Sequence, residues 1–190
     1  IIENINREKA EWNVLGIVDD NPTLQGASVG GYSVLGPTDI LNIRTDKTYV
    51  VCGIGNPSIR KKISEKIFNP NILFPVLIDP SAVVAKDAEL SEGVIIGAGV
   101  LCEKKCRIGK QVMINSHCIV GHESIINDYS MIHLGSNIAG QIEMGECCEI
   151  GMGTNIIQQL KIGAYTMTGA GSVIVKDVQG NCLVAGVPAK

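Results

Sequence analysis

The sequence has few aromatic residues, no run of basic residues and no long apolar stretch. Phenylalanine, tyrosine and tryptophan make up 4% of the 190 residues, although 45% are hydrophobic. A core must therefore be built from isoleucine, valine, leucine, alanine and cysteine. No stretch approaches the ~18 continuous apolar residues of a membrane-spanning helix, and no signal-peptide pattern is visible. We therefore expect no membrane span and a cytoplasmic location.

Charge and cysteine usage exclude further classes of protein. The formal net charge is −3 and the sequence pI is about 5.6. This argues against a nucleic-acid partner, since a protein that binds nucleic acid needs a cationic face. The seven cysteines include no CxxC pair, so the tight spacing of a structural zinc site is absent. We expect reduced, buried thiols and no metal.

What the sequence does have is a repeat of six residues. Stepping by six from Ile78 to Ile174 gives 17 positions, of which 16 are apolar, with no insertion. Four residues after each of these, from Ala82 to Val178, the residues are mostly small or β-branched. The residue directly after the aliphatic position is often glycine, which we expect to relieve the backbone at a corner.

A period of six fits neither an amphipathic helix nor a long alternating strand. It fits a coil with short strands as flat sides and corners every six residues, so that three sides close one turn. Residue n then stacks on residue n−18 at one strand spacing, about 4.8 Å. The sequence predicts a mainly β solenoid over residues 76–190.

Residues 1–75 follow a different pattern. Asn13–Val18 and Thr48–Gly53 are predicted as buried strands, residues 32–36 as an edge strand, and Ile59–Phe68 as a basic helix. This order favours a small α/β domain with a parallel sheet. Asp19, Asp20 and the Gly53–Asn56 loop follow predicted strands, where such sheets bind ligands, and the loop precedes a helix N-terminus suited to a phosphate. Two ordinary turns are the alternative interpretation.

All three histidines lie in the repeat, and His122 has the most suggestive surroundings. It comes two places after an aliphatic position, faces away from the coil interior, and stacks between Lys104 and Gly140. A glycine there leaves a hollow that a ligand can enter. Glu123 follows directly and is able to fix one tautomer of the ring, as a general base requires. His117 is assigned to the small-residue corner column and His133 to a glycine-rich column, and both roles stay open.

The Asp-Asp-Asn turn, the segment GIGNPSIRKKI, the segment IDPSAVV that opens the repeat, and VGHES together resemble one family. It is the sialic-acid O-acetyltransferase and bacillosamine N-acetyltransferase family of bacterial glycan synthesis, and the resemblance spans nearly the whole chain. It implies a left-handed parallel β-helix behind a Rossmann-like α/β domain. Family members begin with a strand and a Gly-rich loop before a helix. Ile1–Glu11 resembles the end of that helix, so we expect this domain to be truncated at its N-terminus.

The resemblance also implies site residues and partners. His122 would be the general base and Glu123 its orienting carboxylate, while Gly140 is placed by stacking to offer an N–H to an oxyanion. Gly140, Met152, Ala170 and Lys190 match positions that hold acetyl-CoA; Asp19, Asp20, Gly53 and Asn56 would read a nucleotide sugar. The family forms homotrimers that share the acyl site between neighbours. A histidine that the family often places near the thioester is Met131 in this chain.

These observations leave several functions open. The leading hypothesis is N-acetylation of a nucleotide-linked amino sugar, because GIGNPSIRKKI resembles the bacillosamine branch; O-acetylation of sialic acid or another sugar is the alternative. A metal hydratase resembling the γ-type carbonic anhydrases would need a histidine more than a coil before His117, and the sequence has none. A non-catalytic scaffold is the third possibility.

Overall fold

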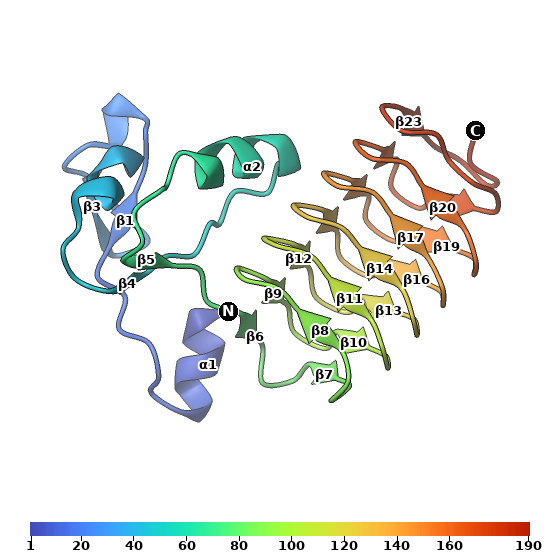
Figure 1. Cartoon of the computed structure of the whole chain (residues 1–190), viewed down its shortest axis with the longest axis horizontal. Coiled ribbons are helices and arrows are strands. Elements are labelled where there is room, and N and C mark those ends of the chain that lie inside the picture. The colour runs from blue at the N-terminus through green and yellow to red at the C-terminus, as the bar shows by residue number, and fades with distance from the viewer.

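The computed structural model describes residues 1–190 and contains a β-helix beside a smaller α/β part (Figure 1). Three stacks of short parallel strands form the flat sides of the β-helix. The first sheet holds β6 (Leu77–Ile78), β9 (Ile95–Ile96), β12 (Met113–Ile114), β15 (Met131–Ile132), β18 (Glu149–Ile150), β21 (Met167–Thr168) and β23 (Leu183–Val184). The second holds β7 (Val83–Val84), β10 (Leu101–Cys102), β13 (Ile119–Val120), β16 (Asn137–Ile138), β19 (Asn155–Ile156) and β22 (Val173–Ile174). The third holds β8 (Glu89–Leu90), β11 (Arg107–Ile108), β14 (Ile125–Ile126), β17 (Glu143–Met144) and β20 (Lys161–Ile162).

The strands pair in the register that the repeat predicts. Cys102 pairs with Val120 and Val120 with Ile138, each 18 residues further along the chain. Stacked parallel strands of this kind fit a left-handed β-helix. The predicted solenoid is therefore confirmed as an arrangement of parallel strands.

Two columns of side chains fill the interior. The aliphatic column from Ile96 to Ile150 is at most 1% exposed, and each such side chain contributes about 1.5–3 kcal/mol of burial free energy. The small residues near the corners are also buried, and the polar ones among them are hydrogen-bonded. Ser124 Oγ donates to the Ala139 carbonyl at 3.1 Å, and Cys118 Sγ donates to the His133 carbonyl at 3.0 Å. Serine and cysteine suit this column because they are small and reach a carbonyl of the next coil.

The three stacks of turns between the sheets form three corners, which we name by their contents. The glycine corner comprises turns 79–82, 97–100, 115–118, 133–136, 151–154 and 169–172; the His122 corner, turns 85–88, 103–106, 121–124, 139–142 and 157–160; and the docking corner, turns 91–94, 109–112, 127–130, 145–148 and 163–166. In most of these turns the third residue has a positive φ. Glycine is the third residue in the glycine corner except at Ser81 and His117, whereas non-glycine residues are third in the other two corners, apart from Gly93.

Contrary to the prediction from the sequence, the glycines directly after the aliphatic positions do not relieve the backbone of the turn. Gly121 has no positive φ, but a Cβ there would lie 2.5 Å from the Gly140 nitrogen of the next coil. Close approach of the next coil, rather than turn conformation, therefore selects glycine at this place.

The final coil is two residues shorter than the others. Val178 pairs with Ile162, and Leu183 pairs with Met167, at a separation of 16 residues rather than 18. The assignment of Val178 to the small-residue column is therefore wrong, since Val178 occupies an aliphatic place.

The α/β part precedes the coils. Its helices are α1 (Ile2–Glu8) and α2 (Pro57–Glu65), with the 3-10 helices η1 (Pro22–Leu24) and η2 (Thr38–Ile43). Its strands are β1 (Ile17–Val18), β2 (Ser28–Val29), β3 (Tyr32–Gly36), β4 (Thr48–Tyr49) and β5 (Ile72–Leu73). No helix of the chain combines the length and the apolar character needed to cross a membrane.

These strands do not form the single parallel sheet that the sequence predicts. They form a three-stranded mixed sheet in the order β1-β3-β2 and a separate parallel pair, β4 and β5. The strand at residues 32–36 lies in the middle of its sheet and not at its edge. The strands predicted at 13–18 and 48–53 shrink to two residues each, because few of their backbone groups find a partner strand.

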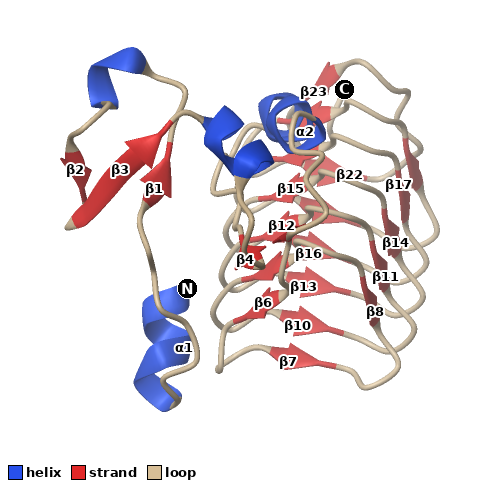
Figure 2. Ribbon diagram, turned by 60° about the vertical axis from the view of Figure 1, so that its left-hand side comes forward, coloured by secondary structure: helices blue, strands red, loops and turns tan.

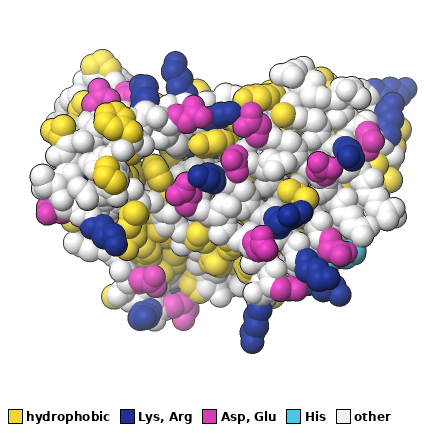
Figure 3. Space-filling view, viewed as in Figure 1, with side chains coloured by type: hydrophobic (Ala, Val, Ile, Leu, Met, Phe, Trp, Pro, Cys, Tyr) yellow, Lys and Arg dark blue, Asp and Glu magenta, His cyan; other side chains and the backbone are white.

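The α/β part attaches to the β-helix through α2, which lies against the docking corner (Figure 2). Lys61 forms an ion pair of 2.8 Å with Glu146, and its ammonium lies 5.9 Å from the ring centroids of Tyr129 and Tyr165. Near the first coil, Asn4 of α1 donates to Asp79 at 2.7 Å. On the face shown in Figure 3, charged side chains of both signs are interspersed over the coils, with no patch of one sign.

Candidate active site

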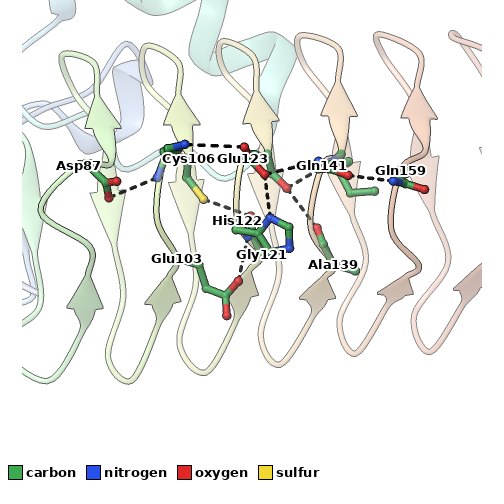
Figure 4. A network of polar contacts seen from close by, with 12 residues as sticks. Asp87, Glu103, Cys106, Gly121, His122, Glu123, Ala139, Gln141 and Gln159 are labelled. Atoms are coloured by element: carbon green, nitrogen blue, oxygen red, sulfur yellow. Dashed lines mark hydrogen bonds and ion pairs between the residues drawn. The ribbon is translucent and has the colours of Figure 1, made fainter.

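His122 projects outward from the turn between β13 and β14. Its Nδ1 lies 3.1 Å from Glu123 Oε2, and the two side chains are 46% and 42% exposed (Figure 4). The hydrogen bond with His122, and secondarily the charge of Lys105 at 4.0 Å, lower the pKa of Glu123. An ionised Glu123 accepts a hydrogen bond from Nδ1–H, so in a neutral ring Nε2 is the unprotonated, basic nitrogen.

Gly140 lies directly against this ring. A Cβ on Gly140 would lie 2.6 Å from His122 Nε2, so only glycine admits the imidazole in this position. The hollow expected beside the ring is therefore filled by the ring itself. The main-chain N–H of the buried Gly140 donates to no protein atom, which is uncommon for a buried backbone group.

A second carboxylate holds His122 from the coil below. Glu103 Oε2 accepts the main-chain N–H of His122 at 2.8 Å, so carboxylates bind both the backbone and the ring of this residue (Figure 4). Glu103 is not among the site residues that the sequence predicts. The sequence feature that could have indicated it is the register of 18 residues: Glu103 stands at the position that is Gly121 and Ala139 in the next two coils.

Above His122 the corner becomes neutral. Gln141 Nε2 donates to Glu123 Oε2 at 3.4 Å, and Gln159 Nε2 donates to Gln141 Oε1 at 2.9 Å. This ladder orients Glu123 from the side opposite Lys105.

Three of the four predicted substrate-binding residues meet at one cavity in the α/β part. Asp19, Asp20 and Gly53 line a space of about 270 Å³, whose other walls are mainly apolar side chains of residues 50–54, β1, η2 and α2. Asn56 does not line it. Asn56 instead caps α2, its Oδ1 accepting the N–H of Ile59 at 3.0 Å.

Most carboxylate oxygens of Asp19 and Asp20 already accept hydrogen bonds from, or lie near, other groups of the protein. One oxygen of Asp20 accepts both the N–H of Thr38, at 2.8 Å, and the Thr38 hydroxyl, while Lys66 lies 3.3 Å from the other oxygen. These bonds, led by the one from the Thr38 hydroxyl, lower the pKa of Asp20. Asp19 Oδ1 accepts the N–H of Asn21. Both carboxylates shape the loops beside the cavity.

The chain is similar in sequence and fold to known proteins. Residues 1–67 match the family model of the PglD N-terminal domain. A histidine-to-asparagine variant of perosamine N-acetyltransferase from Caulobacter crescentus, solved with CoA and GDP-perosamine, is 32% identical to this chain with a TM-score of 0.86; the match covers 92% of this chain and 83% of that one. The chain belongs to the hexapeptide-repeat sugar acetyltransferase family.

Two further structures extend the likeness over the whole chain. The acetyltransferase domain of PglB from Neisseria gonorrhoeae FA1090, in complex with acetyl coenzyme A, is 30% identical with a TM-score of 0.90, covering 100% of this chain and 91% of that one. WeeI from Acinetobacter baumannii AYE is 25% identical with a TM-score of 0.89, covering 99% and 91%.

The acetyl-CoA-binding residues predicted for this acetyltransferase lie in separate places on one chain. Gly140 is in the His122 corner, whereas Met152 and Ala170 stack in successive turns of the glycine corner. Met152 is 54% exposed. Lys190 pairs its backbone with Ala185 beside the last coil. One chain of this acetyltransferase therefore does not gather the four residues.

The other two histidines also lie in the glycine corner. His117 is exposed with a φ of +60° and lies over Gly99, so its assignment to the small-residue column is wrong; Cys118 fills that place. His133 Nε2 lies 3.0 Å from Glu149 Oε1, and the pair is about 70% buried. Met131, on strand β15 just before His133, is buried and pairs in register with Glu149 of β18.

Proposed function

We propose that the chain transfers the acetyl group of acetyl-CoA to the amino group of a nucleotide-linked sugar. The family to which it belongs is one of acetyl-CoA-dependent acyltransferases, and amino-sugar N-acetylation is the activity named for its perosamine relative. The observation that carries the proposal is the outward His122–Glu123 pair at 3.1 Å, next to a glycine whose N–H is free.

In this proposal His122 is the general base. The sugar amine attacks the thioester carbonyl carbon, a C–N bond forms, and the C–S bond breaks as the CoA thiolate leaves. His122 Nε2 takes the proton that the nitrogen loses and returns it to the thiolate. Glu123 holds the ring in the tautomer with a basic Nε2 and stabilises the imidazolium that forms.

The negative charge that develops on the carbonyl oxygen needs a donor. The N–H of Gly140 is suited to this purpose, because it is unpaired within the protein and adjoins the imidazole. A fixed backbone donor of this kind typically contributes about 2.7–4 kcal/mol of transition-state stabilisation.

We further propose that neighbouring chains complete the site in a trimer. On one chain the proposed base, the Met152 and Ala170 positions and the α/β part occupy three different corners. Packing of one β-helix beside another would bring different corners together along a shared groove. The nucleotide would occupy the cavity beside Asp19, Asp20 and Gly53, whose size and apolar walls suit a base and ribose.

A matched pair of acceptors tests the proposed function. The assay would measure CoA release by chromatography with UDP- and GDP-linked 4-amino sugars, their 4-hydroxy counterparts, and free sialic acid. We expect kcat/KM for one amino sugar to exceed that of its hydroxy counterpart by about 10²-fold or more. Faster turnover of the hydroxy sugars or of sialic acid would replace the proposal with O-acetylation.

A further inference from the structure

Arg60 is fully buried between the α/β part and the coils, at 0% exposure. Its guanidinium makes five hydrogen bonds, and every acceptor is a main-chain carbonyl. Nε donates to Gln111 at 2.9 Å, and Nη2 donates to Tyr129 at 2.6 Å and to Ser130 at 3.2 Å. Nη1 donates to Ile54 at 2.6 Å and to Gly55 at 2.9 Å. All the donor capacity of the group is therefore used to join one loop to two coils.

Domain attachment alone does not account for this arrangement. The neighbouring Lys61 already binds Glu146 at the same corner without touching the loop. Arg60 differs because two of its bonds turn back to residues five and six places earlier in its own segment. Those residues belong to the loop whose Gly53 and Ile54 form a wall of the cavity.

Peptide geometry determines where the other side of the loop points. In a trans peptide unit the C=O and the next N–H point in opposite directions. Because the carbonyls of Ile54 and Gly55 point to Arg60, the N–H groups of Gly55 and Asn56 point away from it. Neither N–H donates to any protein atom. Two successive free N–H groups before a helix form a donor set suited to phosphate oxygens.

We propose that Arg60 is a positioning residue that holds the Gly53–Asn56 loop so that the N–H groups of Gly55 and Asn56 bind the diphosphate of the nucleotide sugar. This inference rests on the proposed function for its ligand. By fixing the loop to the carbonyls of Gln111, Tyr129 and Ser130, Arg60 also fixes the nucleotide at a constant distance from the coils. The guanidinium itself does not contact the substrate.

The test compares Arg60→Lys with Lys61→Gln, using calorimetric titration with UDP and GDP. Lysine keeps the charge but has three donors and no planar fork, so it cannot hold loop and coils together. We expect Arg60→Lys to weaken binding of the preferred nucleotide by about tenfold or more and to raise the KM for the nucleotide sugar similarly, with the KM for acetyl-CoA within about twofold. Lys61→Gln, which breaks a docking contact only, should leave all three values unchanged.

Gly55→Pro provides a second variant that leaves Arg60 intact. It deletes one of the proposed N–H donors, and a Cβ at Gly55 would meet no other atom. We expect the same selective loss of nucleotide affinity. A crystal structure of Arg60→Lys should show the Ile54 and Gly55 carbonyls turned from their present direction while the coils superpose.

Three outcomes overturn the inference: normal nucleotide binding by Arg60→Lys, equal losses for nucleotide and acetyl-CoA, or a wild-type protein that binds neither UDP nor GDP. The proposed function fails separately. A wild-type protein that binds a nucleotide, with the expected loss in Arg60→Lys, but acetylates no sugar would sustain the role of Arg60 and refute the transferase reaction.

Discussion

At the His122 corner and at the docking corner, the coils turn through the same backbone conformation. The third residue of the turn has a φ of 59° at Glu123 and 60° at Tyr129. At the docking corner the carbonyls of these turns are bound by Arg60, and Tyr129 lies beside Lys61. At the His122 corner the side chains of His122 and Glu123 stay partly exposed, and the side chains bond to one another along the stack.

The two corners have the same backbone turn but different side chains. The coil therefore fixes where a side chain is placed, and the identity of the side chain decides whether the corner binds another part of the chain or carries the candidate active site. The interior columns and the 18-residue register maintain the fold whatever projects from a turn. Substitutions of coil residues at the His122 corner should therefore change activity with little change in stability, and those of coil residues at the docking corner should do the opposite.

The largest effect is expected for His122→Ala. Without the base, turnover should fall by about 10²-fold or more, while the thermal midpoint and the oligomeric state stay the same. Steady-state kinetics and light scattering would measure both. His117→Ala, an exposed histidine of the glycine corner, serves as the control and should retain turnover; near-normal turnover of His122→Ala would eliminate the proposed base.

The next effect is expected for Gly140→Ala. Its Cβ would lie 2.6 Å from His122 Nε2, so the ring must move, and a shift of this size should lower kcat by about tenfold or more. Gln158→Ala changes the same turn position one coil further on and should have no effect. Equal activity of the two variants would show that the ring need not lie against the Gly140 backbone.

Glu103→Ala should have a smaller effect. It removes the acceptor of the His122 main-chain N–H, and we expect kcat to fall by about fivefold with an unchanged KM for acetyl-CoA. Glu103→Gln keeps an acceptor oxygen and should restore most of the loss. If the glutamine variant is as slow as the alanine variant, then charge rather than the hydrogen bond is what His122 requires.

The smallest effect is expected at the docking corner, for Glu146→Gln. The hydrogen bond from Lys61 lowers the pKa of Glu146, but both side chains are partly exposed, so their pair contributes at most ~1 kcal/mol to stability. A lowered pKa means that this contribution is present above pH 4.5, the ordinary pKa of a glutamate, and is lost as the pH falls through the folded-state value.

Thermal unfolding at several pH values checks that prediction. The wild-type protein should unfold at a higher temperature than the variant at pH 7, and the gap should close below about pH 4, with kcat unchanged throughout. A gap that widens in acid would contradict the assigned direction of the pKa shift.

The repeat made the coils predictable because each residue there depends on contacts six and 18 places away. Ile96, Val120 and Ile138 are buried for a reason that the spacing alone expresses. The same logic located His122 and its neighbour Gly140. It failed at Val178, because the last coil shortens where no repeat signals the change.

The α/β part was less predictable because its structure depends on contacts that have no period. The burial of Arg60 requires carbonyls of Gln111 and Tyr129, which lie 51 and 69 residues away. The hydrogen bond that the His122 main-chain N–H donates to Glu103 also crosses between coils, through one flexible side chain. Local pattern indicates a helix or a turn in such places but cannot say which distant carbonyl a side chain will reach.

The cysteines of the coil interior have a consequence for the chemistry of the protein in oxidising conditions. Burial raises the pKa of Cys102 to about 12 and that of Cys148 to about 11, and it also raises the pKa of Cys106 and Cys118. At neutral pH the Cys102 thiol is therefore almost entirely protonated, and the thiolate is the form that alkylating agents and peroxides attack. Cys147 is buried as well, and burial raises its pKa too. Five of the seven thiols are therefore shielded, so a mild thiol reagent would label the folded chain at Cys52 and Cys182 first.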